Sequence, residues 1–204
     1  MIFIGDVCAQ VQPPISEDAV ACVIRGISHA QNGQYDLAIS QFTEAIGISS
    51  QYAAAYNNRG IAYRHKGLYD QAISDYARAI KLKPKFTEAY YNRGITYWQK
   101  GECDRAISDF TAAIETNPTY ADAYYNRGRA KFEKGEHEGA ITDYTKAIEI
   151  NPKLAEAYYN RGYTFLSDHD YQKAWDDVIK ARDLGYNVSS RILAALRRAL
   201  GSEI

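Results

Sequence analysis

The stretch Tyr91-Asn92-Arg93-Gly94 recurs as Tyr125-Asn126-Arg127-Gly128 and as Tyr159-Asn160-Arg161-Gly162. A variant, Asn57-Asn58-Arg59-Gly60, precedes these copies, and Arg25-Gly26 stands before that variant. The five glycines therefore follow one another at a constant spacing along the chain. A constant period of roughly 20–50 residues is typical of proteins built from stacked units, in which each unit buries its apolar face against its neighbours.

Each unit contains two helical stretches separated by a turn. In the second unit, apolar residues recur at helical spacing from Ala54 to Lys66 and again from Tyr69 to Ile80. The turn between them carries a glycine suited to the left-handed residue that ends a helix. The fifth unit has His169 at this place, and the glycines of the other units are Gly33, Gly67, Gly101 and Gly135. The pattern predicts an all-α protein.

The repeat predicts the following division of the chain. Residues 1–18 form an N-terminal extension, in which Pro13-Pro14 excludes a helix and Ser16 marks a helix start. Residues 19–188 form five repeats, 19–52, 53–86, 87–120, 121–154 and 155–188. Residues 189–204 form a capping helix and tail, because a terminal unit needs a polar outer face.

Composition and motifs restrict the classes of function that we expect for the chain. The 24 Lys and Arg residues nearly balance the 25 Asp and Glu residues, which gives no overall signature of nucleic-acid binding. No apolar run reaches the roughly 20 residues that span a bilayer. Three widely spaced cysteines argue against a disulfide framework, so we expect a cytoplasmic protein. We expect no metal, cofactor or catalytic residue, because histidine spacings and phosphate-loop or nucleophile motifs do not indicate one.

The spacing Tyr56-x2-Arg59-Gly60-x2-Tyr63, followed by Ala72-x3-Tyr76 and Pro84, resembles the tetratricopeptide repeat. The resemblance covers residues 19–188. It implies a right-handed α-solenoid of five helix-turn-helix repeats, which is not catalytic. It also implies a concave groove, lined by the first helix of each repeat, that holds an extended peptide or a helix of a partner protein. One departure is systematic, because arginine stands where the signature has leucine before the glycine.

The resemblance implies that residues 2, 5, 6, 9, 12 and 13 of each repeat face the groove. An asparagine at the sixth place of units two to five would form a row of carboxamides, which can donate to and accept from an extended peptide backbone. The alternative is that these amides bond within or between helices or face water. The peptide-binding residues expected on this basis are Asn58, Asn92, Asn126, Asn160, Tyr91, Tyr125, Tyr159, Arg64, Trp98 and Arg129.

Some members of the family bind the acidic tails of chaperones with lysine and asparagine in the groove. The corresponding places in this chain lack that pattern, and the second place of units three to five is acidic: Glu88, Asp122 and Glu156. We therefore exclude an acidic-tail ligand.

The unusual arginine correlates with an aspartate. In units two to five an aspartate follows the arginine at one constant sequence separation. The first unit has Gln41 at that separation from Arg25. An arginine in place of leucine should bury its stem while its guanidinium seeks an acceptor. We predict structural ion pairs between Arg59, Arg93, Arg127, Arg161 and Asp75, Asp109, Asp143, Asp177, respectively.

Two functions remain open from the sequence. The first is a non-catalytic scaffold that binds a protein or peptide partner in the groove through the asparagine row. The second is self-assembly through residues 1–18, where Ile2, Phe3 and Ile4 form an apolar tip. The groove-facing side of the first unit is itself apolar, with Val23, Ile24 and Ile27. Such a patch is seldom left uncovered, so either the tip or another chain should cover it.

Overall fold

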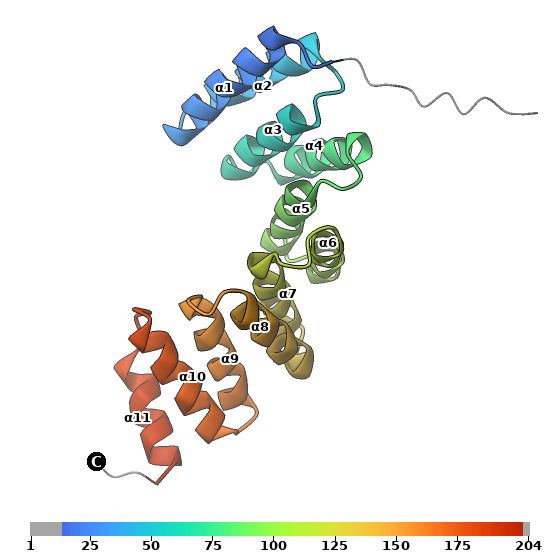
Figure 1. Cartoon of the computed structure of the whole chain (residues 1–204). Helices are drawn as coiled ribbons and strands as arrows, with labels where there is room; N and C mark the ends of the chain where they lie inside the picture. The colour runs from blue at the N-terminus through green and yellow to red at the C-terminus, as the bar shows by residue number, and fades with distance from the viewer. Residues whose placement is uncertain (1–13, 202–204) are drawn as a thin grey trace, which may run out of the picture. The chain divides into compact units, whose positions relative to one another are not determined.

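The computed structural model describes residues 14–201, and these fold as helices joined by short turns (Figure 1). The apolar tip and the first 13 residues lie outside the described residues. The helices are α1 (Glu17–Gln31), α2 (Tyr35–Ile48), α3 (Ala53–His65), α4 (Tyr69–Leu82), α5 (Thr87–Gln99), α6 (Cys103–Thr116), α7 (Ala121–Glu133), α8 (His137–Ile150), α9 (Ala155–Ser167), α10 (Tyr171–Asp183) and α11 (Ser190–Ala199). The described part of the chain contains no strand.

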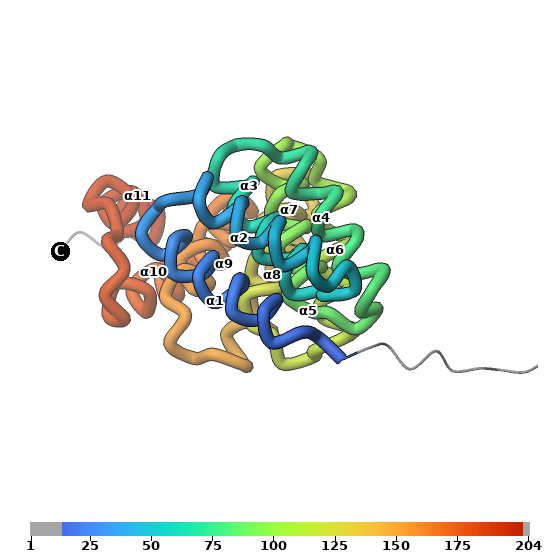
Figure 2. The backbone as a smooth tube through the Cα atoms, turned by 90° about the horizontal axis from the view of Figure 1, so that it is seen from above, coloured from blue at the N-terminus to red at the C-terminus, as the bar shows by residue number. Residues whose placement is uncertain are grey.

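The chain forms two compact units, each made of more than one repeat, that divide between Lys83 and Pro84. The first unit contains the helical hairpins α1–α2 and α3–α4. The second contains the hairpins α5–α6, α7–α8 and α9–α10, and the final helix α11 packs against α10, as both views show (Figures 1 and 2). Consecutive helix pairs thus pack as hairpins, as the all-α repeat pattern predicted.

Local sequence sets the helix ends. The turn inside each of the first four hairpins contains a glycine in the expected left-handed conformation, with φ between 72° and 78° at Gly33, Gly67, Gly101 and Gly135. His169 takes the same role at φ 63°, a conformation that histidine adopts more readily than most residues do. Ser16 precedes α1 as predicted, but its side chain makes no capping hydrogen bond.

The repeated glycine allows the two helices of a hairpin to pack closely. A Cβ atom added to Gly128 would lie 2.8 Å from Cε1 of Tyr144, on the second helix of the same hairpin. Gly26, Gly60 and Gly94 face Phe42, Tyr76 and Phe110 in the same way. The alanine that recurs in the first turn of each second helix is fully buried, as are alanines where one hairpin meets the next, such as Ala113. Small residues and rings therefore fill the core together.

The last helix covers the end of the second unit. Leu196 of α11 is fully buried in one cluster with Ala174 and Val178 of α10, and Ile192 and Leu193 pack against this cluster. The Ser189 hydroxyl accepts a hydrogen bond from the backbone N–H of Arg191 and begins the helix. The exposed side of α11 is basic, with Arg191, Arg197 and Arg198. No helix within residues 14–201 is long and apolar enough to cross a membrane.

Candidate functional site

The first helices of the hairpins line the inner side of the second unit. Helix α7 contacts both α5 and α9, whereas the second helices α6, α8 and α10 make no direct contact with one another among the described residues. The hairpins are therefore closer together on the side of α5, α7 and α9. We call this side the groove face, and its candidate residues come from those three helices.

Asparagine and tyrosine link neighbouring hairpins on the groove face. The Asn126 side-chain NH₂ donates to the Tyr91 hydroxyl at 3.0 Å, and that of Asn160 donates to the Tyr125 hydroxyl at 3.0 Å. In each link the tyrosine belongs to the preceding repeat. Tyr and Asn occupy adjacent places in consecutive repeats, and a bond between helices is the alternative that the sequence left open beside a role in facing a ligand.

Asn126 follows the alternative rather than the ligand-facing role. Its NH₂ also donates to the Asp122 carbonyl at 2.9 Å, and the residue is 7% exposed. Both amide hydrogens are thus used inside the protein, and Asn126 holds α7 against α5 rather than offering an amide donor to a peptide backbone. Asn160 is more accessible, and its Oδ1 accepts no hydrogen bond from another described residue.

A stack of cationic and aromatic groups crosses from α5 to α7. The Arg129 guanidinium lies 4.2 Å from the centre of the Trp98 ring and 5.6 Å from that of Tyr125. The Trp98 indole N–H donates to Oε2 of Glu133 at 2.8 Å, one turn further along α7. Three of the predicted groove residues, Trp98, Tyr125 and Arg129, are therefore brought together, and the indole fixes the orientation of Glu133.

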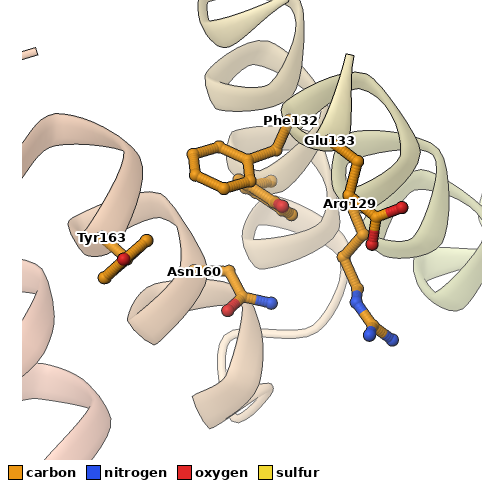
Figure 3. Close-up of a pocket in the computed structure, with 6 residues that line it drawn as sticks. Arg129, Phe132, Glu133, Asn160 and Tyr163 are labelled. Atoms are coloured by element: carbon orange, nitrogen blue, oxygen red, sulfur yellow. The ribbon is translucent and has the colours of Figure 1, made fainter. Parts of the chain in front are cut away.

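A pocket of about 80 Å³ opens between α7 and α9, and Figure 3 shows most of its lining. Phe132 and Tyr163 form an edge-to-face pair with ring centres 5.8 Å apart. In Figure 3 the guanidinium of Arg129 points away from Tyr163, so the aromatic side of the pocket is free of it. The lining residues are Arg129, Phe132, Glu133, Tyr144, Asn160 and Tyr163.

Tyr144 forms the floor of this pocket from α8. The residue is 1% exposed, and its hydroxyl makes no hydrogen bond with any described residue. Burial, followed by the neighbouring Tyr125, raises the pKa of the Tyr144 hydroxyl, which therefore stays protonated. Sequence reasoning missed Tyr144 as a site residue, because its place in the repeat is a core place that faces the glycine.

Further aromatic rings extend the groove face beyond the pocket. Tyr159 lies 4.5 Å, centre to centre, from Tyr186, which follows α10, and 6.5 Å from Tyr163. Tyr91 lies 4.9 Å from Tyr120, which precedes α7. Tyr120 and Tyr186 were not predicted, because both lie in turns outside the places that the resemblance assigns to the groove.

Exposed carboxylates stand in the first turns of α5, α7 and α9. Glu88, Asp122 and Glu156 occupy the same place in three repeats, and none of them forms an ion pair with another described residue. Burial, together with Asp122 and Glu88, raises the pKa of Tyr120 to about 12. Burial also raises the pKa of Tyr125, with a contribution from Glu156. The field of these carboxylates therefore reaches the groove tyrosines.

The arginines of the repeat contact the predicted aspartates. Arg127 binds Asp143 through two hydrogen bonds of 2.9 and 2.7 Å, and Lys131 adds a third contact at 2.8 Å. The Asp143 side chain is only 3% exposed. The other pairs have the same two-bond geometry, with distances of 2.7 to 2.8 Å: Arg59 with Asp75, Arg93 with Asp109, and Arg161 with Asp177.

Each guanidinium is also held by its surroundings. The Arg127 guanidinium lies 5.5 Å from the Tyr124 ring centre, and its third nitrogen donates to the Thr111 hydroxyl of the preceding hairpin at 3.0 Å. Arg161 reaches Thr145 in the same way, and Arg59 reaches Thr43. Hydrogen bonds to Asp75 and Asp177 raise the pKa of Arg59 and Arg161, respectively. The arginines thus join the two helices of a hairpin and, in these three cases, adjacent hairpins.

The first unit presents a different surface. Asn58 on α3 makes no hydrogen bond with another described residue, because the place that tyrosine takes in the other links holds Val23, which has no side-chain acceptor. Arg64, also expected in the groove, is half-buried, and its Nε has no hydrogen-bond partner among the described residues. On α1, Ile24 is 62% exposed and Ile27 39%. Residues 14–201 contain no cluster of side chains suited to a metal ion.

Helical hairpins that repeat with a constant period, with an aromatic and polar face on their first helices, define a helical-repeat protein of the kind that binds other proteins. A family model described as TPR repeat matches residues 26–67, 60–101 and 128–168. Two models described as tetratricopeptide repeat match residues 87–120 and 110–142. The chain belongs to the tetratricopeptide repeat family.

Solved structures show the same fold. MamA is 29% identical, with a TM-score of 0.73 over 78% of this chain and 93% of MamA. YrrB, described as a TPR protein with an unusual peptide-binding site, is 21% identical, with a TM-score of 0.71 over 89% of this chain and 93% of YrrB. PilF of Pseudomonas aeruginosa is 15% identical, with a TM-score of 0.82 over 91% of this chain and 86% of PilF. No curated protein sequence matches the chain significantly.

Proposed function

We propose that the chain is a non-catalytic interaction scaffold that binds a peptide segment of a partner protein along the groove face of α5, α7 and α9. The observation that carries this proposal is the pocket between α7 and α9, where Phe132 and Tyr163 leave aromatic surface accessible beside polar groups that can accept further hydrogen bonds. Tyr163 is 43% exposed, although a large ring gains from being covered. Partly exposed rings beside hydrogen-bonding groups are typical of the anchors of protein interfaces.

The asparagine row has two roles in this proposal. Asn126 joins hairpins, whereas Asn160 lines the pocket, and its Oδ1, which accepts no hydrogen bond from a described residue, can accept one from a ligand. Within the asparagine row, Asn160 is therefore the residue that contributes to peptide recognition. The tyrosines and Phe132 supply most of the contact area. A peptide held this way is recognised partly through its backbone and partly through one side chain in the pocket.

The experiment is selection of a displayed random peptide library on the immobilised full-length chain. Selected peptides should bind wild-type protein, and Phe132→Ala with Tyr163→Ala should weaken them by about tenfold or more, since two interface rings are lost. Tyr69→Ala is the control, because this half-exposed tyrosine starts the second helix α4 of the other unit. Peptides that bind the double variant as tightly as wild type would refute this use of the groove face.

A second function rests on α1. Ile24 and Ile27 are exposed on its surface, and an apolar patch of this kind favours association between copies of the chain. In this alternative the N-terminal residues join the copies. Light scattering would then show a mass that rises with concentration for the full chain, and a monomer for Ile24→Ser with Ile27→Ser and for a chain lacking residues 1–13. A monomer at every concentration would exclude self-assembly.

A further inference from the structure

The pocket between α7 and α9 carries groups that match one kind of side chain. We propose that the partner segment is basic and that a lysine side chain of the partner enters this pocket; the inference rests on the proposed peptide-binding function. The observations are the free acceptors of the pocket, its size, and the charge of the surrounding groove face.

The polar lining consists largely of acceptors. Oδ1 of Asn160 accepts no hydrogen bond from a described residue, and the Glu133 carboxylate accepts from only two groups in the described part of the chain, the Trp98 indole and, more weakly, Cys103. Tyr144, a residue that is 1% exposed, adds a hydroxyl to the pocket lining, and this hydroxyl accepts no hydrogen bond from a described residue. An ammonium group has three donors and no acceptor, so it suits a pocket whose polar groups can accept hydrogen bonds.

The walls and volume also suit lysine. Phe132 and Tyr163 offer ring surface to the methylene stem, and ring faces attract a cation. The pocket has a volume of about 80 Å³, which is room for the end of one side chain. A guanidinium is a broader, planar fork that prefers a bidentate partner, which favours lysine over arginine.

The charge of the groove face points the same way. Glu133 lines the pocket together with the guanidinium of Arg129. Three further carboxylates lie near tyrosines of the groove face, Glu88 and Asp122 near Tyr120 and Glu156 near Tyr125. The guanidinium of Arg129 is already placed against Trp98 and Tyr125 and donates to Oδ1 of Asn126 at 3.5 Å. Helix dipoles account for acids in first turns, but not for Glu133, which lies at the end of α7. A row of carboxylates beside the lysine pocket would attract further basic residues of the same segment.

The test uses pools of short synthetic peptides that differ only at a fixed central residue: lysine, arginine, acetyl-lysine or glutamate. The flanking residues are drawn from Ala, Gly, Ser and Tyr, and binding to the full chain is followed by fluorescence anisotropy. The lysine pool should bind about tenfold or more tightly than the acetyl-lysine and glutamate pools, because a charged hydrogen bond is lost in both. Its binding should also weaken as salt is added.

Two variants test whether the preference for lysine depends on the pocket. Glu133→Gln keeps an oxygen for the Trp98 indole and should remove most of the preference for lysine over acetyl-lysine. Glu138→Gln, an exposed glutamate on α8, makes the same charge change away from the pocket and should leave the preference intact. Circular dichroism confirms that both variants are folded.

The outcomes separate the two proposals. If peptides bind without preference for lysine, or if the glutamate pool binds best, the lysine inference is wrong while peptide binding stands. The same holds if Glu133→Gln and Glu138→Gln reduce the preference equally. If no pool binds and the displayed library also yields nothing, the proposed function itself fails.

Discussion

The first and fourth repeats have the same backbone plan but different chemistry at matching places. In the fourth repeat Arg127 binds a buried Asp143 through two hydrogen bonds, whereas in the first repeat an exposed Arg25 makes one hydrogen bond of 2.7 Å to Gln41. On the groove side the fourth repeat has Asn126 and Arg129, and the first has exposed Ile24 and Ile27. The period therefore sets the packing of helices in both repeats, while charge and hydrogen bonding vary from one repeat to another.

The largest difference between the two repeats should be the contribution of this side-chain pair to the free energy of unfolding. Asp143→Ala should lower the free energy of unfolding by about 3–5 kcal/mol, because it leaves Arg127 and Lys131 without their buried partner. Gln41→Ala should change it by no more than about 1 kcal/mol, since Arg25 is solvent-exposed. Urea unfolding followed by circular dichroism measures both.

A rescue variant separates loss of the pair from general damage to α8. Arg127→Leu combined with Asp143→Ala should recover much of the lost stability, because leucine needs no buried acceptor. Equal destabilisation by Asp143→Ala and Gln41→Ala would show that the buried pair contributes no more than the exposed one, and the contrast between the repeats would then disappear.

Replacing the repeated glycine should destabilise the two repeats to a similar degree. Gly26→Ala and Gly128→Ala place a Cβ atom 2.5 Å from Phe42 and 2.8 Å from Tyr144, respectively. Overpacking of this kind costs about 1–3 kcal/mol, more than the helix gains from alanine. Gly47→Ala in α2 meets nothing within 4 Å and should instead stabilise by up to about 1 kcal/mol. Thermal unfolding compares the three variants, and stabilisation by Gly128→Ala would mean that the ring moves aside freely.

The smallest effect should come from making the first repeat resemble the others. Gln41→Asp offers Arg25 a carboxylate at the place where later repeats have one. The gain should be about 0–1 kcal/mol, since an exposed pair is screened by solvent. Urea unfolding at low and high salt detects it, because only a charge-dependent gain declines with salt. If Gln41→Asp raised the free energy of unfolding by as much as Asp143→Ala lowers it, solvent exposure would not limit the strength of the Arg25 pair.

The sequence by itself determined the elements within one repeat. The constant glycine period predicted the helical hairpins, because helical spacing and turn glycines act over a few residues. The constant separation along the chain also predicted which aspartate each arginine contacts. The structure places the two side chains of each pair within 2.9 Å, because the arginine lies on the first helix and the aspartate on the second helix of the same hairpin. A partner inside a hairpin is largely fixed by the position along the chain.

Only the tertiary structure decided what the groove residues contact. The family resemblance implied that Asn126 and Asn160 lie on the groove side, but their bonds to tyrosines of the preceding repeat depend on how adjacent hairpins are offset. Tyr144 occupies the same place as Phe110, yet it lines a pocket because Phe132, Asn160 and Tyr163 leave space above it. Such contacts join different hairpins, and their distances follow from the packing of whole helices rather than from any local pattern.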